Sequence, residues 1–371
     1  MGPVRNVSVT TAQLTRQFVE LPYAMYAGDA HWVPPLRRDE RRRLSRQHNP
    51  FLAHADMDLW IAQSDGRVAG RIAAIEDRLH NEKHGERVTW FGFLEAENAA
   101  TAEALLTTVE EWADARGCRI MRGPANPSLN ESAGLLVDGF DADPSILMPY
   151  NPPEYAAFVE SAGYRKVKDL LAWSLDLSVP IADRIARLAA RVKQRRGIVV
   201  RPIDLRQFDR ELANLQAIYR AAWDENWGFV PPTDAEIKQL AVDLRPIVDP
   251  EIALFAEIDG RAIGCAIALP DLNQVLKRMN GRLFPFGLWH FLRRASVIDQ
   301  VRLPLLGVVA EYRHIGLYPL LIAEIFRRGV ARGYRRAELS WTLEDNHAVN
   351  AGIEAAGAVR TKTYRLYEKR L

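Results

Sequence analysis

One stretch, residues 303–333, decides the fold: LPLLGVVAEYRHIGLYPLLIAEIFRRGVARG. Its apolar, β-branched start predicts a buried strand. A polar turn with the single glycine Gly316 follows. The rest predicts an amphipathic helix with Pro319 at its first position and Gly333 as a left-handed cap at its end. The apolar side chains that fall on one helical stripe are Leu317, Leu320, Leu321, Ile325 and Phe326.

The predicted turn lies at the N-terminus of this helix, where unpaired N–H groups and the helix dipole attract phosphate. Arg313 and His314 add side-chain donors, and Gly316 allows main chain to approach a ligand closely. The Gly-Lys-Ser/Thr of a Walker loop and the three glycines of a dinucleotide fingerprint are absent. The turn is therefore expected to bind phosphate in another way.

Residues 308–316 resemble the pyrophosphate loop, Arg-x-x-Gly-x-Gly/Ala, of the GNAT N-acetyltransferases. Arg313 and Gly316 match the motif, whereas Tyr318 replaces its small third position. The resemblance implies an α/β fold with a mixed sheet and an acetyl-CoA or longer acyl-CoA co-substrate. The cofactor-binding residues that it implies are Leu306, Gly307, Val308, Arg313, His314, Ile315, Gly316, Leu317, Tyr318 and, from the next block, Asn346.

The downstream sequence continues the resemblance. Residues 337–341 predict the next strand, and residues 344–357 resemble the family's second block, in which Asn346 takes the place of a cofactor-contacting asparagine. Gly352 departs from it, since many members carry near this position a tyrosine that protonates the leaving thiolate. Residues 362–367 predict the closing strand.

Size and composition limit the number of domains and the classes of partner that the chain can have. A chain of 371 residues suggests two or three domains of about 150 residues each. The net charge of +2 gives no general attraction to nucleic acid, so no nucleic-acid partner is expected. The two cysteines, Cys118 and Cys265, lie far apart and imply neither a disulfide framework nor a metal site. No apolar run reaches about 18 residues and no signal peptide is evident, so a cytoplasmic protein is expected.

Two halves of the chain resemble each other. The spacing from Gly66 to Gly260, each in an Asp-Gly hairpin signal, is 260 − 66 = 194. The spacing from Gly163 to Gly357, each at a helix end, is again 357 − 163 = 194. Between these landmarks, Gly117 and Gly333 are 333 − 117 = 216 residues apart, which is 216 − 194 = 22 more than the other two spacings. The second half therefore has about 22 extra residues before Gly333, and the first half has about 22 extra residues after Gly117, which restore the spacing of 194.

We therefore predict two GNAT-like units in tandem, at 1–180 and 198–371, joined by a linking helix at 181–197. In the first half, residues 91–100 stand where the phosphate loop would be. They contain two glutamates and no arginine, and after Gly92 no glycine stands in the loop. The first unit is thus expected to be a degenerate copy that shapes the acceptor site, and the second to bind acyl-CoA.

Acyl transfer to an amine requires donors for the acyl carbonyl, a base for the amine and an acid for the thiolate. Glu338, beside the loop strand, is the leading base, although an ion-paired structural carboxylate is the ordinary alternative. Tyr364 and Tyr367 are candidates for the missing acid, although packing is the more ordinary role of such tyrosines. The predicted catalytic residues are Glu338, Glu344 and Tyr364, and Glu311, His347 and Tyr367 are further candidates.

Each half carries a long insert. Residues 122–153 are rich in proline, glycine and asparagine but also apolar, which favours an ordered loop that helps to wall the acceptor site. Residues 283–294 mix aromatic residues and leucines with arginines, which suits peripheral contact with the inner membrane face. Simple packing is the alternative for both inserts.

Taken together, the sequence predicts an N-acyltransferase that moves an acyl group from acyl-CoA to a primary amine by direct attack. The whole chain is also similar to a set of two-unit bacterial GNAT proteins near the bacterial ceramide synthases, which implies a long-chain lipid amine as acceptor in place of a small-molecule one. Two alternatives remain: an aminoacyl-tRNA-dependent transferase of the cell-wall type, and a non-catalytic acyl-CoA-binding protein.

Overall fold

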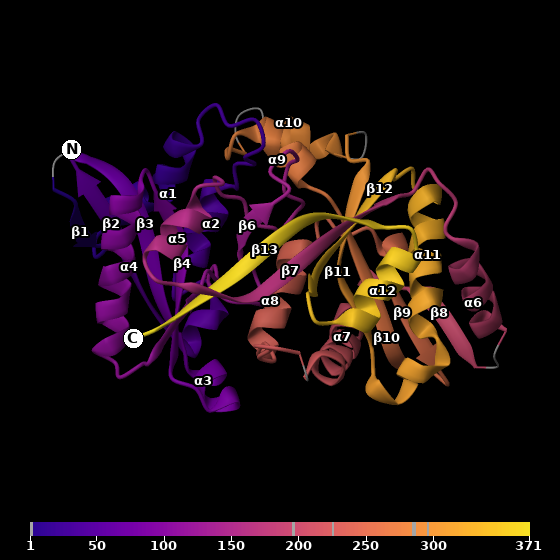
Figure 1. The fold of residues 1–371 in the computed structure, drawn as a ribbon. Coiled ribbons are helices and arrows are strands. Elements are labelled where there is room, and N and C mark those ends of the chain that lie inside the picture. The colour runs from indigo at the N-terminus through magenta and orange to yellow at the C-terminus, as the bar shows by residue number, and fades with distance from the viewer. Residues whose placement is uncertain (1–2, 195–196, 225, 284–286, 295–296) are drawn as a thin grey trace. The chain divides into compact units, whose positions relative to one another are not determined.

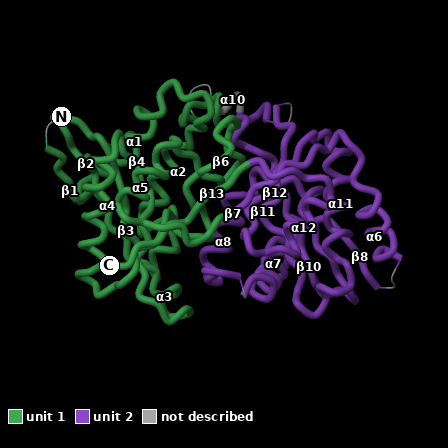
Figure 2. The backbone as a smooth tube through the Cα atoms, in the orientation of Figure 1, with its two compact units in different colours: residues 1–170, 276–290, 362–371 green, residues 171–275, 291–361 purple. Residues whose placement is uncertain are grey.

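The computed structural model is a mixed α/β chain (Figure 1), and it describes residues 3–194, 197–224, 226–283, 287–294 and 297–371. The chain forms two compact units (Figure 2). Unit 1 comprises residues 1–170, 276–290 and 362–371, and unit 2 comprises residues 171–275 and 291–361. Within the described residues, no helix is both long and apolar enough to cross a membrane.

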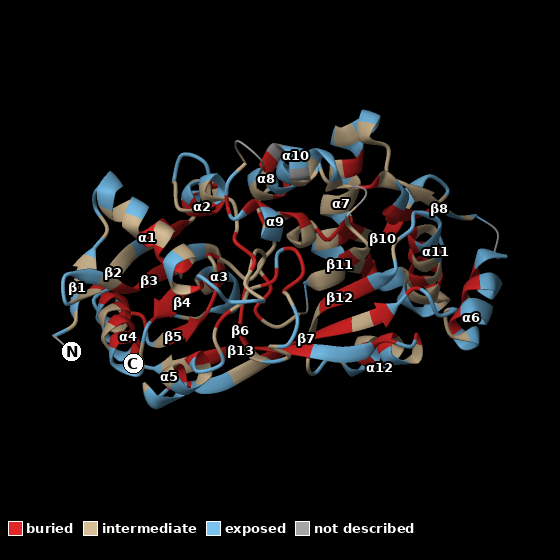
Figure 3. Cartoon of the chain, turned by 90° about the horizontal axis from the view of Figure 1, so that it is seen from above, coloured by how far each residue is buried: buried red, intermediate tan, exposed pale blue. Residues whose placement is uncertain are grey.

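Unit 1 is a sheet with helices packed on it. Its strands follow the spatial order β1 (Arg5–Ser8), β2 (Ala55–Ser64), β3 (Arg67–Asp77), β4 (Val88–Ala96), β5 (Ile120–Gly123) and β13 (Val359–Arg370), and β6 (Leu135–Asp138) also pairs with β13. Its helices are α1 (Ala12–Met25), α2 (Arg37–Arg43), α3 (Arg78–His84), α4 (Ala99–Asp114) and α5 (Tyr155–Ser161), with the 3-10 helix η1 (Pro50–Ala53). Buried residues concentrate on the strands (Figure 3), and every residue of β4 is buried.

Unit 2 repeats this plan. Its strands follow the order β7 (Arg165–Asp176), β12 (Arg336–Leu343), β11 (Gln300–Val308), β10 (Arg261–Pro270), β9 (Ala253–Ile258) and β8 (Ile198–Pro202). Its helices are α6 (Asp183–Lys193), α7 (Phe208–Trp223), α8 (Asp234–Leu244), α11 (Leu317–Ala331) and α12 (His347–Ala355), with the 3-10 helices η2 (Leu205–Gln207), η3 (Pro250–Ile252) and η5 (Ala310–Ile315). The helix α10 (Gly287–Leu292) lies in the predicted second insert and α9 (Asn273–Met279) precedes it, and residues 276–290 of this stretch belong to unit 1.

The repeat read from the sequence recurs in backbone detail. Both Asp-Gly pairs form two-residue hairpin turns with positive φ at each position: 51° and 77° at Asp65 and Gly66, and 49° and 78° at Asp259 and Gly260. Positive φ at both residues is the type I′ geometry that suits the twist of a hairpin. The two predicted hairpins, β2–β3 and β9–β10, are therefore confirmed.

The compact units do not follow the predicted boundaries at 180 and 198. Strand β7 begins in unit 1 and ends in unit 2, and strand β13 begins in unit 2 and ends in unit 1. The division into 1–180, 181–197 and 198–371 follows the sequence repeat, and the roles assigned to its parts stay predictions. A helix does form in the predicted linking segment, namely α6, which belongs to unit 2.

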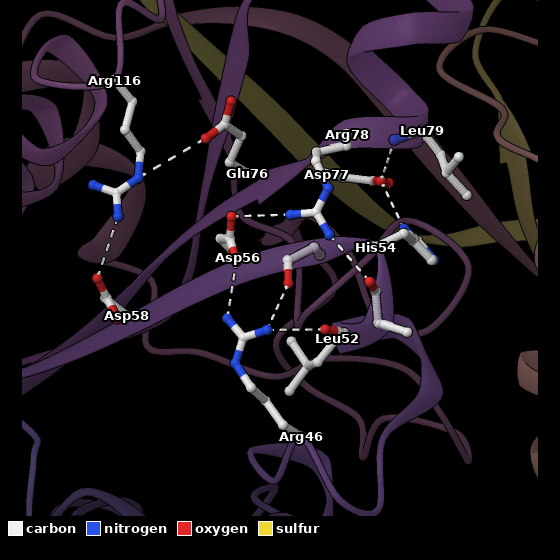
Figure 4. A network of polar contacts seen from close by, with 12 residues as sticks. Arg46, Leu52, His54, Asp56, Asp58, Glu76, Asp77, Arg78, Leu79 and Arg116 are labelled. Carbon is white, nitrogen blue, oxygen red and sulfur yellow. Dashed lines mark hydrogen bonds and ion pairs between the residues drawn. The ribbon is translucent and has the colours of Figure 1, made fainter.

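Ion pairs lie at the start of β2 and at the end of β3 in unit 1 (Figure 4). Arg46 and Arg78 both contact Asp56, at 3.0 and 2.9 Å, from side chains that are half exposed. Exposed pairs of this kind contribute little stability. The buried Arg122 differs, because it contacts Glu86 at 3.0 Å and Glu368 of β13 at 2.7 Å. It therefore ties the last strand of the chain into unit 1.

The last strand also supplies core to unit 1, which gives a stability prediction. Tyr367 is fully buried, and its hydroxyl donates to Glu160 at 3.0 Å. We expect Tyr367→Ala to lower the free energy of unfolding by about 3–5 kcal/mol, as large-to-small core changes do. The exposed Arg370 on the same strand is the control, because Arg370→Ala removes no buried contact. Urea unfolding of the two variants checks this, and equal stabilities would contradict the role of β13 in the core.

Candidate functional site

The two parallel strands at the centre of unit 2 separate part-way along their length. β11 pairs with β12 from Gln300 opposite Arg336 to Leu303 opposite Leu339. Beyond that pair β11 continues for five residues (308 − 303) and β12 for four (343 − 339). Residues 304–306 are only half-buried although β11 is a central strand. The separation therefore leaves main chain of β11 outside the β11–β12 ladder.

A β-bulge in β11 coincides with the separation. Arg302 lies opposite Leu269 of β10 and Leu305 opposite Ile267, so β11 has one residue more than its partner between these pairs. Strand β4 of unit 1 has an equivalent bulge between Gly92 and Glu95. A bulge re-aims the side chains that follow it and is common beside active sites.

The bulge sorts the residues of β11 onto two faces. On β10, Leu269, Ile267 and Cys265 are two residues apart, so their side chains lie on one face of the sheet. Their partners on β11 lie on the same face, and these are Arg302, Leu305 and Gly307. Helix α7 covers this face, because a Cβ added at Gly307 would lie 2.3 Å from Cη2 of Trp223. Gly307 is therefore required for close packing of that indole. On the other face, Leu306 packs with side chains of α6 and α11.

After β11 the chain forms the 3-10 helix η5, then Gly316, then α11. Gly316 has φ 85° and ψ 29°, and a Cβ there would lie 3.0 Å from Cγ2 of Val192. The predicted glycine turn is confirmed. The prediction that Pro319 opens the helix is wrong, because α11 begins at Leu317 and Pro319 is its third residue. Gly333 has φ 88° directly after the C-cap residue, as predicted.

The side chains of the turn point in different directions. Arg313 donates from Nη2 to the carbonyl oxygen of Ala222 at 2.9 Å, and so braces the end of α7. His314 is exposed and Ile315 is half-buried. Burial raises the pKa of the Tyr318 hydroxyl, while Arg313 and the Val308 main chain act in the opposite direction. Contact of these residues with a phosphate stays a prediction.

A buried polar group lies where β11 and β12 separate. The Arg302 guanidinium donates from Nε to Ser340 Oγ at 2.8 Å, and the Ser340 hydroxyl donates to Glu338 Oε1 at 2.6 Å. All three residues are buried. Glu338 is the register partner of Arg302 and therefore lies on the same sheet face, the one covered by α7. Sequence reasoning found Glu338 but missed the other two, although an arginine inside an apolar run was a signal.

The remaining candidates lie further along unit 2 or in unit 1. Glu344 is half-buried in the turn after β12, and the Asn346 side chain caps α12 by accepting from Val349 N at 3.4 Å. Tyr364 is fully buried in β13 opposite Leu136, within unit 1. The structure thus places Tyr364 in a different compact unit from the other predicted site residues. Glu311 and His347 are exposed.

Unit 1 has the same strand separation, but its own chain fills it. β4 pairs with β5 only as far as Trp90 opposite Arg122. Beyond this pair, Ala125 N donates to Phe91 O at 2.9 Å, and Asn126 Oδ1 accepts from Phe93 N at 2.5 Å. The first insert therefore bonds to main chain that the equivalent strand of unit 2 leaves outside its ladder.

The connection after β4 is also short. Two residues, 97 and 98, separate β4 from α4, whereas eight residues, 309–316, separate β11 from α11. The side chain of Asn98 accepts from Thr101 N at 2.9 Å and so caps α4 directly. The buried Glu95 accepts from the hydroxyls of Tyr26 and Tyr155 at 2.6 and 2.9 Å. Unit 1 thus has neither the turn nor the open strand of unit 2.

Other chemistries find little support among the described residues. Burial raises the pKa of Cys265 to about 12 and also raises that of Cys118, so both thiols stay protonated near neutral pH. No group of three or more His, Cys, Asp or Glu side chains that could hold a metal ion occurs in the described ranges. The geometry that stands out is therefore the separated strand end, the glycine turn and the buried carboxylate.

Two proteins of known sequence resemble the chain along nearly its whole length. The bacterial ceramide synthase of Caulobacter vibrioides (strain NA1000 / CB15N) is 36% identical over 373 residues, which covers 98% of this chain and 97% of that protein. Protein YghO of Escherichia coli (strain K12) is 35% identical over 364 residues, covering 96% and 93%. No protein-family model matches the chain.

Solved structures show the same fold at low identity. A tandem GNAT protein from the clavulanic acid biosynthesis pathway superposes with a TM-score of 0.61 at 16% identity, over 99% of this chain and 98% of that one. A GCN5-related N-acetyltransferase from Sphaerobacter thermophilus gives a TM-score of 0.56 at 16% identity, over 100% and 97%. The fold and the relatives together support acyltransferase activity in general. The chain belongs to the family that includes the bacterial ceramide synthase of C. vibrioides, and it has the tandem GNAT fold.

Proposed function

We propose that the chain is an N-acyltransferase in which an amine directly attacks the thioester of an acyl-CoA. The observation that carries the proposal is the separation of β11 from β12 between the glycine turn and the buried carboxylate of Glu338. A donor and an acceptor could meet there from the two faces of one sheet. The acceptor would then approach from the face that holds Glu338 and is covered by α7.

The donor half of the site would use mainly main-chain groups. N–H groups of residues 306–308 that lie outside the β11–β12 ladder can donate to the thioester carbonyl and stabilise the charge that develops on its oxygen. The first N–H groups of α11, beside Gly316, favour a diphosphate. Residues 313–318 would hold the pyrophosphate, and Asn346 would contact the cofactor as the family resemblance implies.

The chemical step needs a proton acceptor and no covalent enzyme intermediate. The amine nitrogen would form a bond to the acyl carbon while the carbon–sulfur bond breaks and the thiolate leaves with the electron pair. Glu338, oriented by Ser340, would take the proton from the attacking nitrogen. The protonated state of Cys118 and Cys265 favours this direct route over an acyl-cysteine.

The acceptor that we propose is a long-chain lipid amine. The relative from C. vibrioides is named a ceramide synthase, and Trp223, Tyr219 and Leu305 give the α7 side of the separation an apolar lining. On α10, Trp289 and Leu292 expose 60% and 65% of their surface, which suits peripheral contact with a membrane that holds the lipid. Residues 284–286 of this predicted membrane segment lie outside the described part of the chain.

A transfer screen tests the proposal. We expect the purified full-length protein to consume acyl-CoA only when a primary amine is present, with long-chain amines in mixed vesicles preferred over soluble amines. Free CoA and the amide would be measured together. Tight CoA binding without turnover for any amine would favour the non-catalytic binding protein, and transfer from aminoacyl-tRNA alone would favour the cell-wall type of transferase.

The glycine turn gives a second prediction. Because Gly316 is left-handed and lies against Val192, we expect Gly316→Ala to strain the turn by about 1–2 kcal/mol and to weaken CoA binding by about tenfold. Gly352→Ala is the matched control, since a Cβ at that helical position meets nothing within 4 Å. Calorimetric titration with CoA measures both variants. Equal affinity of Gly316→Ala and the wild type would argue against pyrophosphate binding at this turn.

The carboxylate gives a third prediction. Glu338→Gln keeps the shape and the contact with Ser340 but removes the base, so we expect kcat to fall by about 10²–10⁴-fold. The dissociation constant for acyl-CoA should stay unchanged, because the carboxylate is assigned to the acceptor. Glu344→Gln is the control and distinguishes the two predicted glutamates. A full rate in Glu338→Gln with loss in Glu344→Gln would transfer the role to Glu344.

A further inference from the structure

Helix α6 is fixed to unit 2 by its apolar face. Ile185 is buried in a cluster with Ile322 of α11, and Ala189 and Val192 are buried in the main core of the unit. These three side chains of α6 are spaced by four and three residues, so they lie on one stripe of the helix. The other face of α6 is therefore held at the surface of unit 2.

The outer face of α6 carries a stripe of three arginines. Arg184, Arg187 and Arg191 are exposed and are spaced by three and four residues, so they lie on one side of the helix. None of the three forms an ion pair with a described residue. The neighbouring α11 differs, because its exposed Arg327 pairs with Glu324 at 2.8 Å. The fold thus leaves the charge of the α6 stripe unneutralised.

This charge is concentrated in a chain that is nearly neutral. Helix α6 contains three arginines and Lys193 against Asp183 alone, which gives it a net charge of 4 − 1 = +3. The whole chain has 49 cationic and 47 anionic side chains, so its net charge is +2. Attraction to an acidic partner would therefore come from this surface more than from the overall charge.

One end of the stripe lies at the glycine turn. Val192, next to Arg191, lies 3.0 Å from the position of a Cβ on Gly316. From Arg191 the stripe runs back to Arg184, which is about 10 Å along the helix axis. Leu306 of β11 packs with the cluster of α6 and α11, so α6 lies on the donor face of the sheet, opposite to α7. A partner on the stripe would contact the part of the donor that extends beyond the turn.

We propose that the arginine stripe docks an acidic protein that carries the acyl group as a thioester on a phosphopantetheine arm, and that this carrier protein is a donor beside acyl-CoA. The inference rests on the proposed function, which assigns the donor's phosphate to the glycine turn. The chemical step is the same. The amine nitrogen bonds to the acyl carbon, the carbon–sulfur bond breaks, the arm leaves as a thiolate with the electron pair, and Glu338 takes the amine's proton.

The size of the stripe favours a carrier protein over the nucleotide of CoA. A nucleotide bound at the turn would extend past one arginine at the near end of α6. Three arginines over about 10 Å instead match the acidic surface of a protein, where complementary charge guides docking and gives specificity.

A membrane matches the stripe less well than a carrier protein does. Helices that lie in a membrane surface present large apolar side chains beside their cations. On α6 the large apolar side chains of Ile185 and Val192 are buried in unit 2, and Leu188 is half-buried. The proposed lipid acceptor would also approach from the face covered by α7, which is the opposite face of the sheet.

Charge reversal at the end of the stripe away from the turn tests the docking. We expect Arg184→Glu with Arg187→Glu to lower kcat/KM for a carrier-bound long-chain acyl donor by at least about tenfold, and by less at high salt, because salt screens the attraction. With acyl-CoA and the same amine, kcat/KM should stay within about twofold of the wild-type value. The matched control is Lys238→Glu with Arg360→Glu, which changes the charge equally at two exposed positions of unit 2.

A competition experiment measures the docking without the thioester. An acyl carrier protein that lacks its phosphopantetheine arm should still inhibit transfer from the loaded carrier to the amine, because it occupies the arginine stripe. Its inhibition constant should be weaker by about tenfold in the double variant of Arg184 and Arg187. Binding of both proteins to vesicles of anionic phospholipid is measured beside it.

The outcomes separate the two proposals. Transfer from acyl-CoA with no transfer from the loaded carrier, or undiminished transfer from the carrier in the double variant, overturns the docking and leaves the proposed function standing. Equal loss with both donors, or loss of vesicle binding alone, assigns the stripe to CoA or to a membrane and also overturns the docking. No transfer from either donor to any amine overturns the proposed function, and the docking with it. A loss confined to the carrier-bound donor supports both.

Discussion

The structure depends on one constraint: a central strand that stops pairing must satisfy its main-chain N–H and C=O groups elsewhere. Such groups are obligatory hydrogen-bonding partners, and burying them unpaired is unfavourable. In unit 2, β11 leaves β12 after Leu303 and Leu339, at a bulge that also turns Arg302 and Gly307 toward α7. The buried Arg302–Ser340–Glu338 group connects the two strands at the junction where they separate.

The two units meet this constraint in different ways. In unit 1 the first insert supplies the hydrogen-bond partners: Ala125 N donates to Phe91 O, and Asn126 Oδ1 accepts from Phe93 N. A Cβ on Gly92 would lie 1.9 Å from the Ala125 carbonyl oxygen, so the first insert lies close against β4. In unit 2 the neighbour of Leu306 is instead the apolar side of α6.

The sequence predicted the parts of this arrangement that local signals determine. The β-branched run before Val308, the left-handed Gly316 and the two Asp-Gly hairpins each have a physical reason that acts within a few residues. The start of α11 was predicted two residues late, because proline favours a first turn without requiring the first position.

Other features depended on distant partners and could not be predicted from one stretch. Arg302 is buried and donates to Ser340, which lies 38 positions away in the sequence. The placement of Tyr364 in unit 1 depends on which strands β13 pairs with, and a local pattern does not encode that choice. The same holds for α6, whose helical pattern was recognised but whose contact with Leu306 comes from tertiary packing.

The comparison of the two units separates the requirements of the fold from those of the site. The hairpin, the bulge and the parallel strand pair occur in both, so the sheet needs only the apolar pattern and its turns. The left-handed glycine turn lies where eight residues connect strand and helix, whereas the two-residue connection after Ala96 leads directly into the Asn98 cap of α4. Under the proposed function the site would consist largely of main chain and one connection length, so a unit with the short connection has the fold without this site.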